Sequence, residues 1–149
     1  MSAPLIYVAG AIDYTDNSDH AASAPAHCDL WPEGAEVFCP KCENDGETVE
    51  GAVLHKNFEA ITNADLVVAF MSTAVLSVGT PIEVWEKAAF SPERVLLVHE
   101  SENGSLGLFA RWWQSEGVEI INVLASDGLK SQTIMDEVRL RVARKLIQL

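Results

Sequence analysis

Short apolar runs recur along this chain, and helical spacing follows most of them. The clearest run, residues 66–70 (Leu-Val-Val-Ala-Phe), is continuously apolar, which is typical of a strand covered on both faces. The other expected strands occupy residues 5–9, 36–39, 95–98 and 118–121. Helices are expected within residues 53–61, 81–90, 106–116 and 131–149.

This alternation of strands and helices predicts a parallel sheet with helices on both faces. We therefore expect one α/β domain over residues 1–149, with a doubly wound five-stranded sheet in the flavodoxin-like order 2-1-3-4-5. Ligands of such sheets bind beyond the carboxyl ends of the strands, where the winding direction switches. That point lies between strands 1 and 3, so the candidate site draws on residues 10–20, on residues 71–83 and on the start of the helix after strand 2.

The formal net charge of −12 makes a nucleic acid polymer a poor partner, because an acidic surface repels phosphate backbones. A single nucleotide can still bind through amides and hydroxyls. No apolar run approaches the ~20 residues of a membrane-spanning helix, and the N-terminus lacks the basic region of a signal peptide. Three cysteines without a secretion signal favour a reducing compartment, so we expect a cytoplasmic protein.

Cys39 and Cys42, in Cys-Pro-Lys-Cys, resemble one half of a zinc site. Zinc needs four ligands, and the only neighbouring pair is His27-Cys28, whose adjacent residues chelate one ion poorly. The alternative is that Cys39 ends strand 2 as a small buried residue while Cys42 lies in a loop. We expect neither a metal nor a cofactor.

Glu83 stands at the expected start of a helix, at the ligand edge of the sheet. The run Thr80-Pro81-Ile82-Glu83 fits a capping box, with Thr80 as N-cap and Glu83 as its partner. A helix N-terminus also favours the ionised carboxylate that attacks an anomeric carbon. Capping and catalysis both remain open here. So do two readings of Ser77, an ordinary loop hydroxyl or a donor to a 5′-hydroxyl or phosphate.

Three segments, in matching order and spacing, carry a resemblance to a known family. They are residues 6–13 (Ile-Tyr-Val-Ala-Gly-Ala-Ile-Asp), 57–69 (Asn-Phe-Glu-Ala-Ile-Thr-Asn-Ala-Asp-Leu-Val-Val-Ala) and 77–83 (Ser-Val-Gly-Thr-Pro-Ile-Glu). Together they resemble the nucleoside 2-deoxyribosyltransferase superfamily, which includes the 2′-deoxynucleoside 5′-phosphate N-hydrolases.

The resemblance implies that Glu83 attacks C1′ of a nucleoside or nucleotide and forms a glycosyl-enzyme ester as the base departs. A second base then accepts the sugar in a transferase, which we place first, or water accepts it in a hydrolase. Tyr7 would position Glu83 and the sugar, although a core tyrosine is the alternative. Gly10, Asp13 and Gly79 match the family's substrate-binding segments.

One position departs from the family pattern and bears on proton transfer. Asn57 replaces an aspartate, eight residues before Asp65, that handles protons in the family; an amide can hydrogen-bond but cannot act as a general acid. The nearby substitutes are Asp13, Asp16 and Glu59. Asp65 opens strand 3 at the opposite edge, where we expect it to serve a turn.

Ser77 is a second informative difference. Transferases of free nucleosides often carry an aspartate there, whereas the monophosphate hydrolases carry a serine, which tolerates a phosphate dianion. The serine tilts the substrate slightly toward a 5′-monophosphate. Ala11 works against this tilt, because it removes a phosphate-binding hydroxyl, and neither residues 10–20 nor residues 71–83 contain Arg or Lys.

Family members complete their site with a neighbouring subunit, so the resemblance implies a homo-oligomer in which Ser105 could contact substrate. The alternative is a helix-capping loop around Ser105. Trp85, Trp112 and Trp113 suit either an oligomer interface or a core. Asn57 supports a further alternative, a nucleotide-binding module without catalysis. Dinucleotide binding is less favoured, because no G-x-G-x-x-G run follows strand 1.

Overall fold

A computed structural model describes residues 2–10, 31–40, 50–72, 79–127 and 131–149 of the 149-residue chain. Its strands are β1 (Leu5–Ala9), β2 (Glu36–Phe38), β3 (Leu66–Ser72), β4 (Val95–Ser101) and β5 (Glu119–Leu124). Its helices are α2 (Glu50–Asn63), α3 (Gly79–Ala88), α4 (Leu108–Ser115) and α5 (Gln132–Gln148), with a 3₁₀ turn η2 (Pro92–Arg94).

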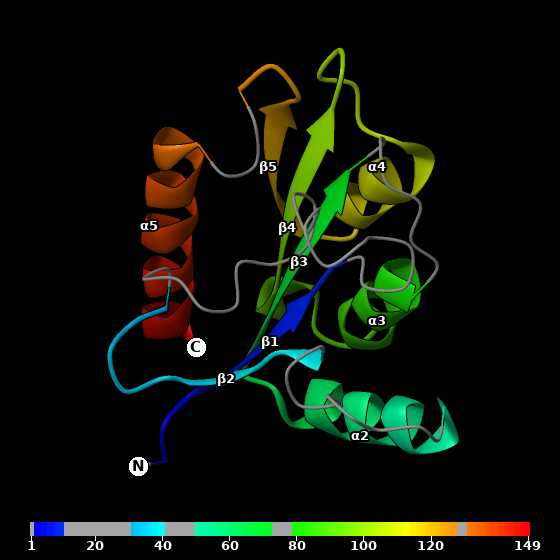
Figure 1. Ribbon diagram of the computed structural model, residues 1–149, viewed down its shortest axis with the longest axis vertical. Helices are drawn as coiled ribbons and strands as arrows, with labels where there is room; N and C mark the ends of the chain where they lie inside the picture. Colours follow the sequence, from blue (N-terminus) through cyan, green and yellow to red (C-terminus); the bar gives the residue numbers. More distant parts are fainter. Residues whose placement is uncertain (1, 11–30, 41–49, 73–78, 128–130) are drawn as a thin grey trace.

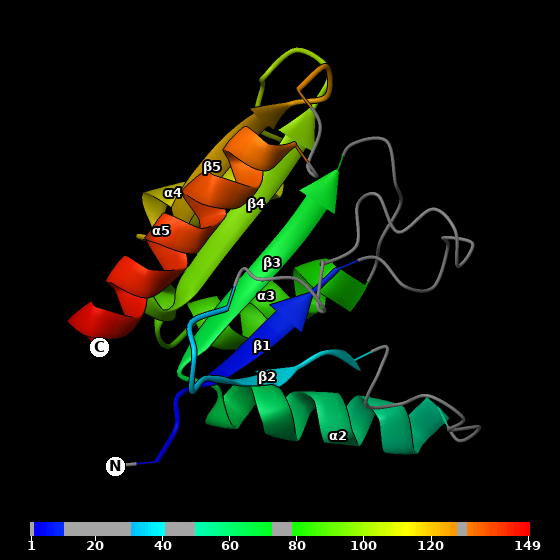
Figure 2. The same ribbon diagram turned by 60° about the vertical axis from the view of Figure 1, so that its left-hand side comes forward.

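The five strands form one parallel sheet in the order β2-β1-β3-β4-β5, which confirms the predicted topology. Figures 1 and 2 show α5 on one face of this sheet and α2, α3 and α4 on the other. Because all of the strands are parallel, the carboxyl ends of β1, β3 and β4 lie at the same edge of the sheet. That edge holds the candidate site.

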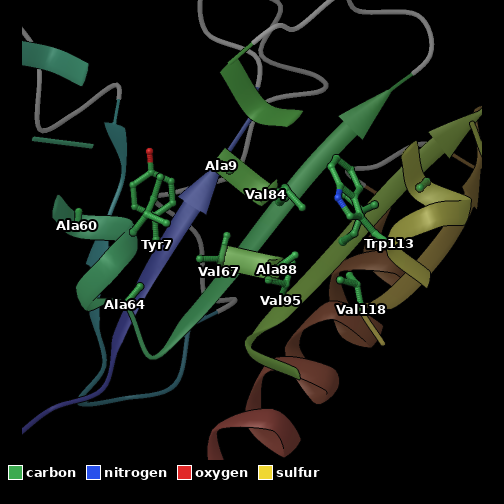
Figure 3. Close-up of a cluster of buried hydrophobic side chains, with 14 residues drawn as sticks. Tyr7, Ala9, Ala60, Ala64, Val67, Val84, Ala88, Val95, Trp113 and Val118 are labelled. Carbon is green, nitrogen blue, oxygen red and sulfur yellow. The ribbon is translucent and has the colours of Figure 1, made fainter. Parts of the chain in front are cut away.

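Alternate residues of each strand pack into separate cores on the two faces of the sheet. On the α5 face, Val68 and Phe70 of β3 pack with Val138 and Val142 of α5. The other core joins the strands to α2, α3 and α4, and its members include Tyr7, Ala60, Val67, Val84 and Trp113 (Figure 3). The continuously apolar strands are thus explained, because both of their faces are buried.

Gly117 turns the chain sharply between α4 and β5. Its φ of +103° lies in the left-handed region that glycine adopts without strain. The amide of Val118 donates to the carbonyl of Trp113 at 3.0 Å, and the amide of Gly117 donates to the carbonyl of Gln114 at 3.1 Å. These two bonds form a Schellman motif, which satisfies carbonyls at the end of α4.

Lys87, on the buried side of α3, joins this helix to the end of α2. Its side-chain ammonium donates to the carbonyls of Ile61 at 3.3 Å, Thr62 at 3.4 Å and Ala64 at 2.6 Å. Carbonyls at a helix C-terminus lack partners within the helix and carry the negative end of its dipole. Burial, followed by repulsion from Arg94, lowers the pKa of Lys87 below its usual value.

Asp65 fastens the amino edge of the sheet, opposite the candidate site. Its carboxylate accepts a hydrogen bond from the amide of Leu5 at 2.8 Å, and its own amide donates to the carbonyl of Leu5, also at 2.8 Å. The guanidinium of Arg94 lies 3.6 Å from the Asp65 carboxylate. These contacts give Asp65 the structural role that its position predicts.

None of the helices in the described parts of the chain combines the length and the apolar character that a membrane crossing requires.

Candidate active site

Tyr7 occupies the centre of the candidate site, on the face of β1 that α2 and α3 cover. Its side chain is fully buried, and its ring stacks on that of Phe38 with the centroids 5.4 Å apart. The stack follows from the strand register, because Tyr7 and Phe38 are direct partners in the β1–β2 pair. In Figure 3 the ring lies beside Ala60 of α2 and Ala64, which directly follows that helix. Tyr7 is therefore both a core residue and a candidate site residue.

The Tyr7 hydroxyl lies within electrostatic reach of the Glu83 carboxylate. Burial is the main cause that raises the pKa of Tyr7 above its usual value, and the charge and hydrogen-bonding influence of Glu83 raise it further. No described residue forms a hydrogen bond of standard geometry with this hydroxyl. We interpret the Tyr7 hydroxyl and the Glu83 carboxylate as neighbours that do not form a hydrogen bond with each other in this conformation. A tyrosine with a raised pKa stays protonated, so it can donate to the carboxylate.

Glu83 is half-buried on α3, and its carboxylate points back toward the start of that helix. Its Oε1 would lie 3.8 Å from a Cβ placed on Gly79. The predicted capping box is wrong, because α3 begins at Gly79 and its first turn contains no acidic residue. Thr80 is buried inside the helix rather than acting as its cap, and Pro81 remains in the first turn, where its missing N–H costs little. Glu83 therefore lies in the second turn.

Asn57 reaches the site side of α2, whereas Glu59 does not. Asn57 is 5% exposed and lies one turn before Ile61, on the helix face that packs toward Tyr7. Glu59 is exposed and is displaced by roughly 200° around a helix of 3.6 residues per turn. Of the three proposed substitutes for the missing aspartate, Glu59 thus faces away from the sheet. Asp13 and Asp16 lie outside the described residues.

The remaining predicted substrate-binding residues that the structure describes follow the carboxyl ends of β1, β3 and β4. Gly10 directly follows β1 at the carboxyl edge, and Gly79 begins α3. Ser77 lies outside the described residues. Ser105 is exposed in the β4–α4 loop, where its amide donates to Asn103 Oδ1 at 3.0 Å. It does not cap α4, because the N-cap position is occupied by Gly107.

The zinc hypothesis concerns residues that are mostly outside the described part of the chain. Cys39 is half-buried with a free thiol just beyond β2, while Cys28, Cys42 and His27 lie outside the described residues. Within the described residues, no group of three or more His, Cys, Asp or Glu side chains could hold a metal ion.

Two buried polar residues of β4 escaped the sequence analysis. His99 is 4% exposed and Ser101 is 3% exposed, and both lie on the same sheet face as Leu97 and Tyr7, toward the carboxyl edge. Neither His99 Nδ1 nor Ser101 Oγ has a hydrogen-bond partner among the described residues. A signal was present, since His99 directly continues the apolar run of the strand, but an apolar-run criterion ends the strand before it.

We expect His99 to make the fold less stable in mild acid. Burial lowers the pKa of His99 below its usual 6.5, so between the lowered pKa and 6.5 the unfolded chain binds more protons than the folded one. The free energy of unfolding should then fall as pH decreases through that window, by at most about 1.4 kcal/mol per pH unit. Urea unfolding of wild type and His99→Gln between pH 7.5 and 5 tests this. Identical pH profiles for the two proteins would contradict it.

Comparison with known proteins adds no assignment, since no protein-family model matches the chain and no curated protein matches it.

Proposed function

We propose that this protein cleaves the N-glycosidic bond of a nucleoside or nucleotide, with Glu83 as the nucleophile. The observation that carries the proposal is the proximity of Glu83 to the buried, protonated Tyr7 near the carboxyl edge of a doubly wound sheet. This edge is where such sheets bind ligands. A carboxylate beside a neutral hydroxyl donor is also a sound nucleophile at an anomeric carbon, because the donor orients it without neutralising it.

The reaction runs in two displacements. A Glu83 carboxylate oxygen bonds to C1′ while the C1′–N bond breaks, and the base leaves with that electron pair and takes up a proton. The nitrogen of a second base, or the oxygen of water, then bonds to C1′, loses its proton and releases the Glu83 carboxylate. Tyr7 is a positioning residue in both steps. Transfer to a second base is our first expectation, and hydrolysis is the alternative.

Asn57 favours the second candidate function, a nucleotide-binding module without turnover. A buried amide at this position cannot supply a proton to the departing base. A module of this kind would bind a nucleoside or nucleotide yet leave its glycosidic bond intact. In both cases the partner is a small molecule rather than a nucleic acid polymer, and we infer that the protein acts as a homo-oligomer.

A 2-fluoro-2-deoxy nucleoside provides the decisive test, because its fluorine slows both displacements and lets the glycosyl-enzyme ester accumulate. We expect intact-protein mass spectrometry to reveal one added fluorosugar, and peptide mapping to place it on Glu83. Adding a foreign base should then release a new nucleoside in a transferase, while water alone regenerates a hydrolase. Binding without any adduct would support the non-catalytic module, and an adduct elsewhere would refute the role of Glu83.

A further inference from the structure

A small pocket opens between α3 and α4, near the C-terminal ends of both helices. Its volume is about 210 Å³, and its lining residues are Trp85, Ala88, Ala89, Trp112, Trp113 and Glu116. Ala88 ends α3, Glu116 directly follows α4, and β4 and β5 begin shortly after them. The pocket therefore lies toward the amino edge of the sheet, away from the candidate active site at the carboxyl edge.

Tryptophan side chains dominate the wall of this pocket. Trp85 and Trp112 are 48% and 38% exposed, and their rings stack with centroids 4.6 Å apart and planes 21° from parallel. Each ring gives one face to this stack and keeps the other. Trp113 is buried and lines the same pocket. Because indole attracts a cation over its face more strongly than any other side-chain ring, three indoles around one small pocket favour a ligand that is both apolar and positively charged.

The charges around the pocket also favour a cation. Among the described residues that line it, Glu116 alone is charged, and its exposed carboxylate pairs with no Lys or Arg in the described parts of the chain. Lys87 of α3 donates instead to carbonyls at the end of α2, and Arg111 lies roughly 140° around α4 from Glu116. The C-terminal ends of α3 and α4 add the negative ends of two helix dipoles. A cation in this pocket is therefore attracted by its surroundings.

The apolar walls determine which kind of cation fits. A primary ammonium is strongly hydrated and loses free energy when it enters a pocket with few hydrogen-bond acceptors. A quaternary ammonium has no N–H group and presents methyl groups to the rings, so it loses much less. The volume of about 210 Å³ is also below the roughly 300 Å³ of the smallest ordinary ligand pockets, so the ligand is small.

We propose that this pocket binds a small quaternary ammonium compound, with its methyl groups against the indole rings and its charge beside Glu116. The ligand is a free small molecule rather than a methylated lysine of another protein. A bound peptide needs a long groove or a sheet edge for its backbone, whereas this small pocket lies between two helices. The proposal concerns a second site and does not rest on the proposed reaction, so either one can fail alone.

Isothermal titration calorimetry of the full chain with choline tests the site. We expect saturable binding of choline, and we expect its neutral isostere 3,3-dimethyl-1-butanol to bind at least tenfold more weakly, because the attraction depends on the charge. Ethanolamine, whose ammonium carries N–H groups, should also bind at least tenfold more weakly. An isostere that binds as tightly as choline would overturn the proposal, and so would a failure to saturate at about 10 mM choline.

Two substitutions separate the aromatic attraction from the charge. Trp85→Leu keeps an apolar side chain but removes an aromatic face, and it should raise the dissociation constant of choline at least tenfold. Glu116→Gln keeps the shape and removes the charge, and it should raise this constant about threefold and weaken its dependence on salt. Glu33→Gln, the same change in an exposed turn, is the matched control and should bind choline as the wild type does. Circular dichroism checks that each variant keeps the fold.

Nuclear magnetic resonance locates the ligand on the protein. Choline should shift the indole N–H resonances of Trp85 and Trp112, which Trp85→Leu and Trp112→Leu identify, and should leave that of Trp31, which packs on the α5 face of the sheet. A trimethyllysine peptide that binds at least tenfold more tightly than choline would overturn the assignment to a free small molecule. Unchanged choline affinity in folded Trp85→Leu and Glu116→Gln proteins would overturn the site itself.

Discussion

Glu83→Ala is expected to lower the rate of base release from a nucleoside or its 5′-monophosphate at least 1000-fold, while the protein stays folded. The reason is that the proposed covalent intermediate needs this carboxylate, and loss of a nucleophile removes most of the rate acceleration (a loss of about 10³-fold or more). Glu83 is half-buried near the middle of α3 and is not a member of the hydrophobic core, so the fold should tolerate alanine. Chromatographic measurement of the free base, with a series of deoxynucleosides and monophosphates, gives the result.

Three further variants sharpen this test. Glu83→Gln keeps the shape of the side chain and should be as inactive as alanine, because an amide is no nucleophile. Tyr7→Phe keeps the ring stack on Phe38 and should cost only about tenfold, as expected for a residue that positions another group. Glu33→Gln, in an exposed turn, should change nothing. A folded Glu83→Ala protein that releases base at the wild-type rate would end the assignment.

Lys87→Met is expected to lower the free energy of unfolding by about 2 kcal/mol, because it leaves buried carbonyls at the end of α2 without a donor. The carbonyl of Ala64 is the most affected, since it accepts the shortest of the three bonds, at 2.6 Å. Methionine preserves the aliphatic stem, so packing against α2 should change little. Urea unfolding at pH 7 measures the difference.

The pH dependence of stability separates the Lys87 ammonium from its stem. Because the folded state lowers the pKa of Lys87, the unfolded chain holds this proton more tightly between the lowered pKa and 10.5. Wild-type stability should therefore gain from this group as pH rises through that window, and Lys87→Met should lack that gain. Lys56→Met, at an exposed position of α2, is the control and should stay within about 0.5 kcal/mol of wild type. Equal losses at both lysines would refute the capping role.

The strand order could be predicted because both faces of the sheet are buried. The sequences of β1, β3 and the start of β4 are therefore continuously apolar and easy to recognise as strands. The strand ends could not be predicted in this way. His99 and Ser101 extend β4, and Asn122 extends β5, because their backbones continue the ladder in register with neighbouring strands. Polar side chains interrupt the apolar pattern without interrupting the backbone hydrogen bonds, so an apolar-run criterion stops too early.

The tryptophans show a second limit of the pattern. Trp112 and Trp113 are adjacent on α4, yet Trp113 is buried in the core while Trp112 lies on the surface against Trp85. Adjacent helical positions differ by about 100°, so the phase of the helix decides which ring is buried. Composition does not fix this phase, and α4 is only eight residues long with apolar side chains at five of them, so no clear periodicity distinguishes its buried side. For this reason only the structure shows which of the two rings is buried.

At the site, the sequence could indicate Tyr7 and Glu83 by their positions relative to β1 and α3, but not their mutual approach. The sequence also predicted Glu83 two positions closer to the helix start than it is, because Thr80-Pro81 reads as a helix start although the helix includes Gly79. The relation between Glu83 and Tyr7 depends on how α3 lies across β1, and this is a property of packing rather than of local sequence.

The shortest strand has an unexpected bearing on function. β2 spans three residues and pairs with β1 alone, so it is held by fewer backbone bonds than any interior strand. Phe38, which backs the Tyr7 ring, belongs to it. We therefore expect β2 to separate from β1 on warming, by local unfolding, while the rest of the molecule stays folded. If the proposed function is right, affinity for a nucleoside should then fall at temperatures well below global unfolding, because the Phe38 ring no longer stacks on Tyr7.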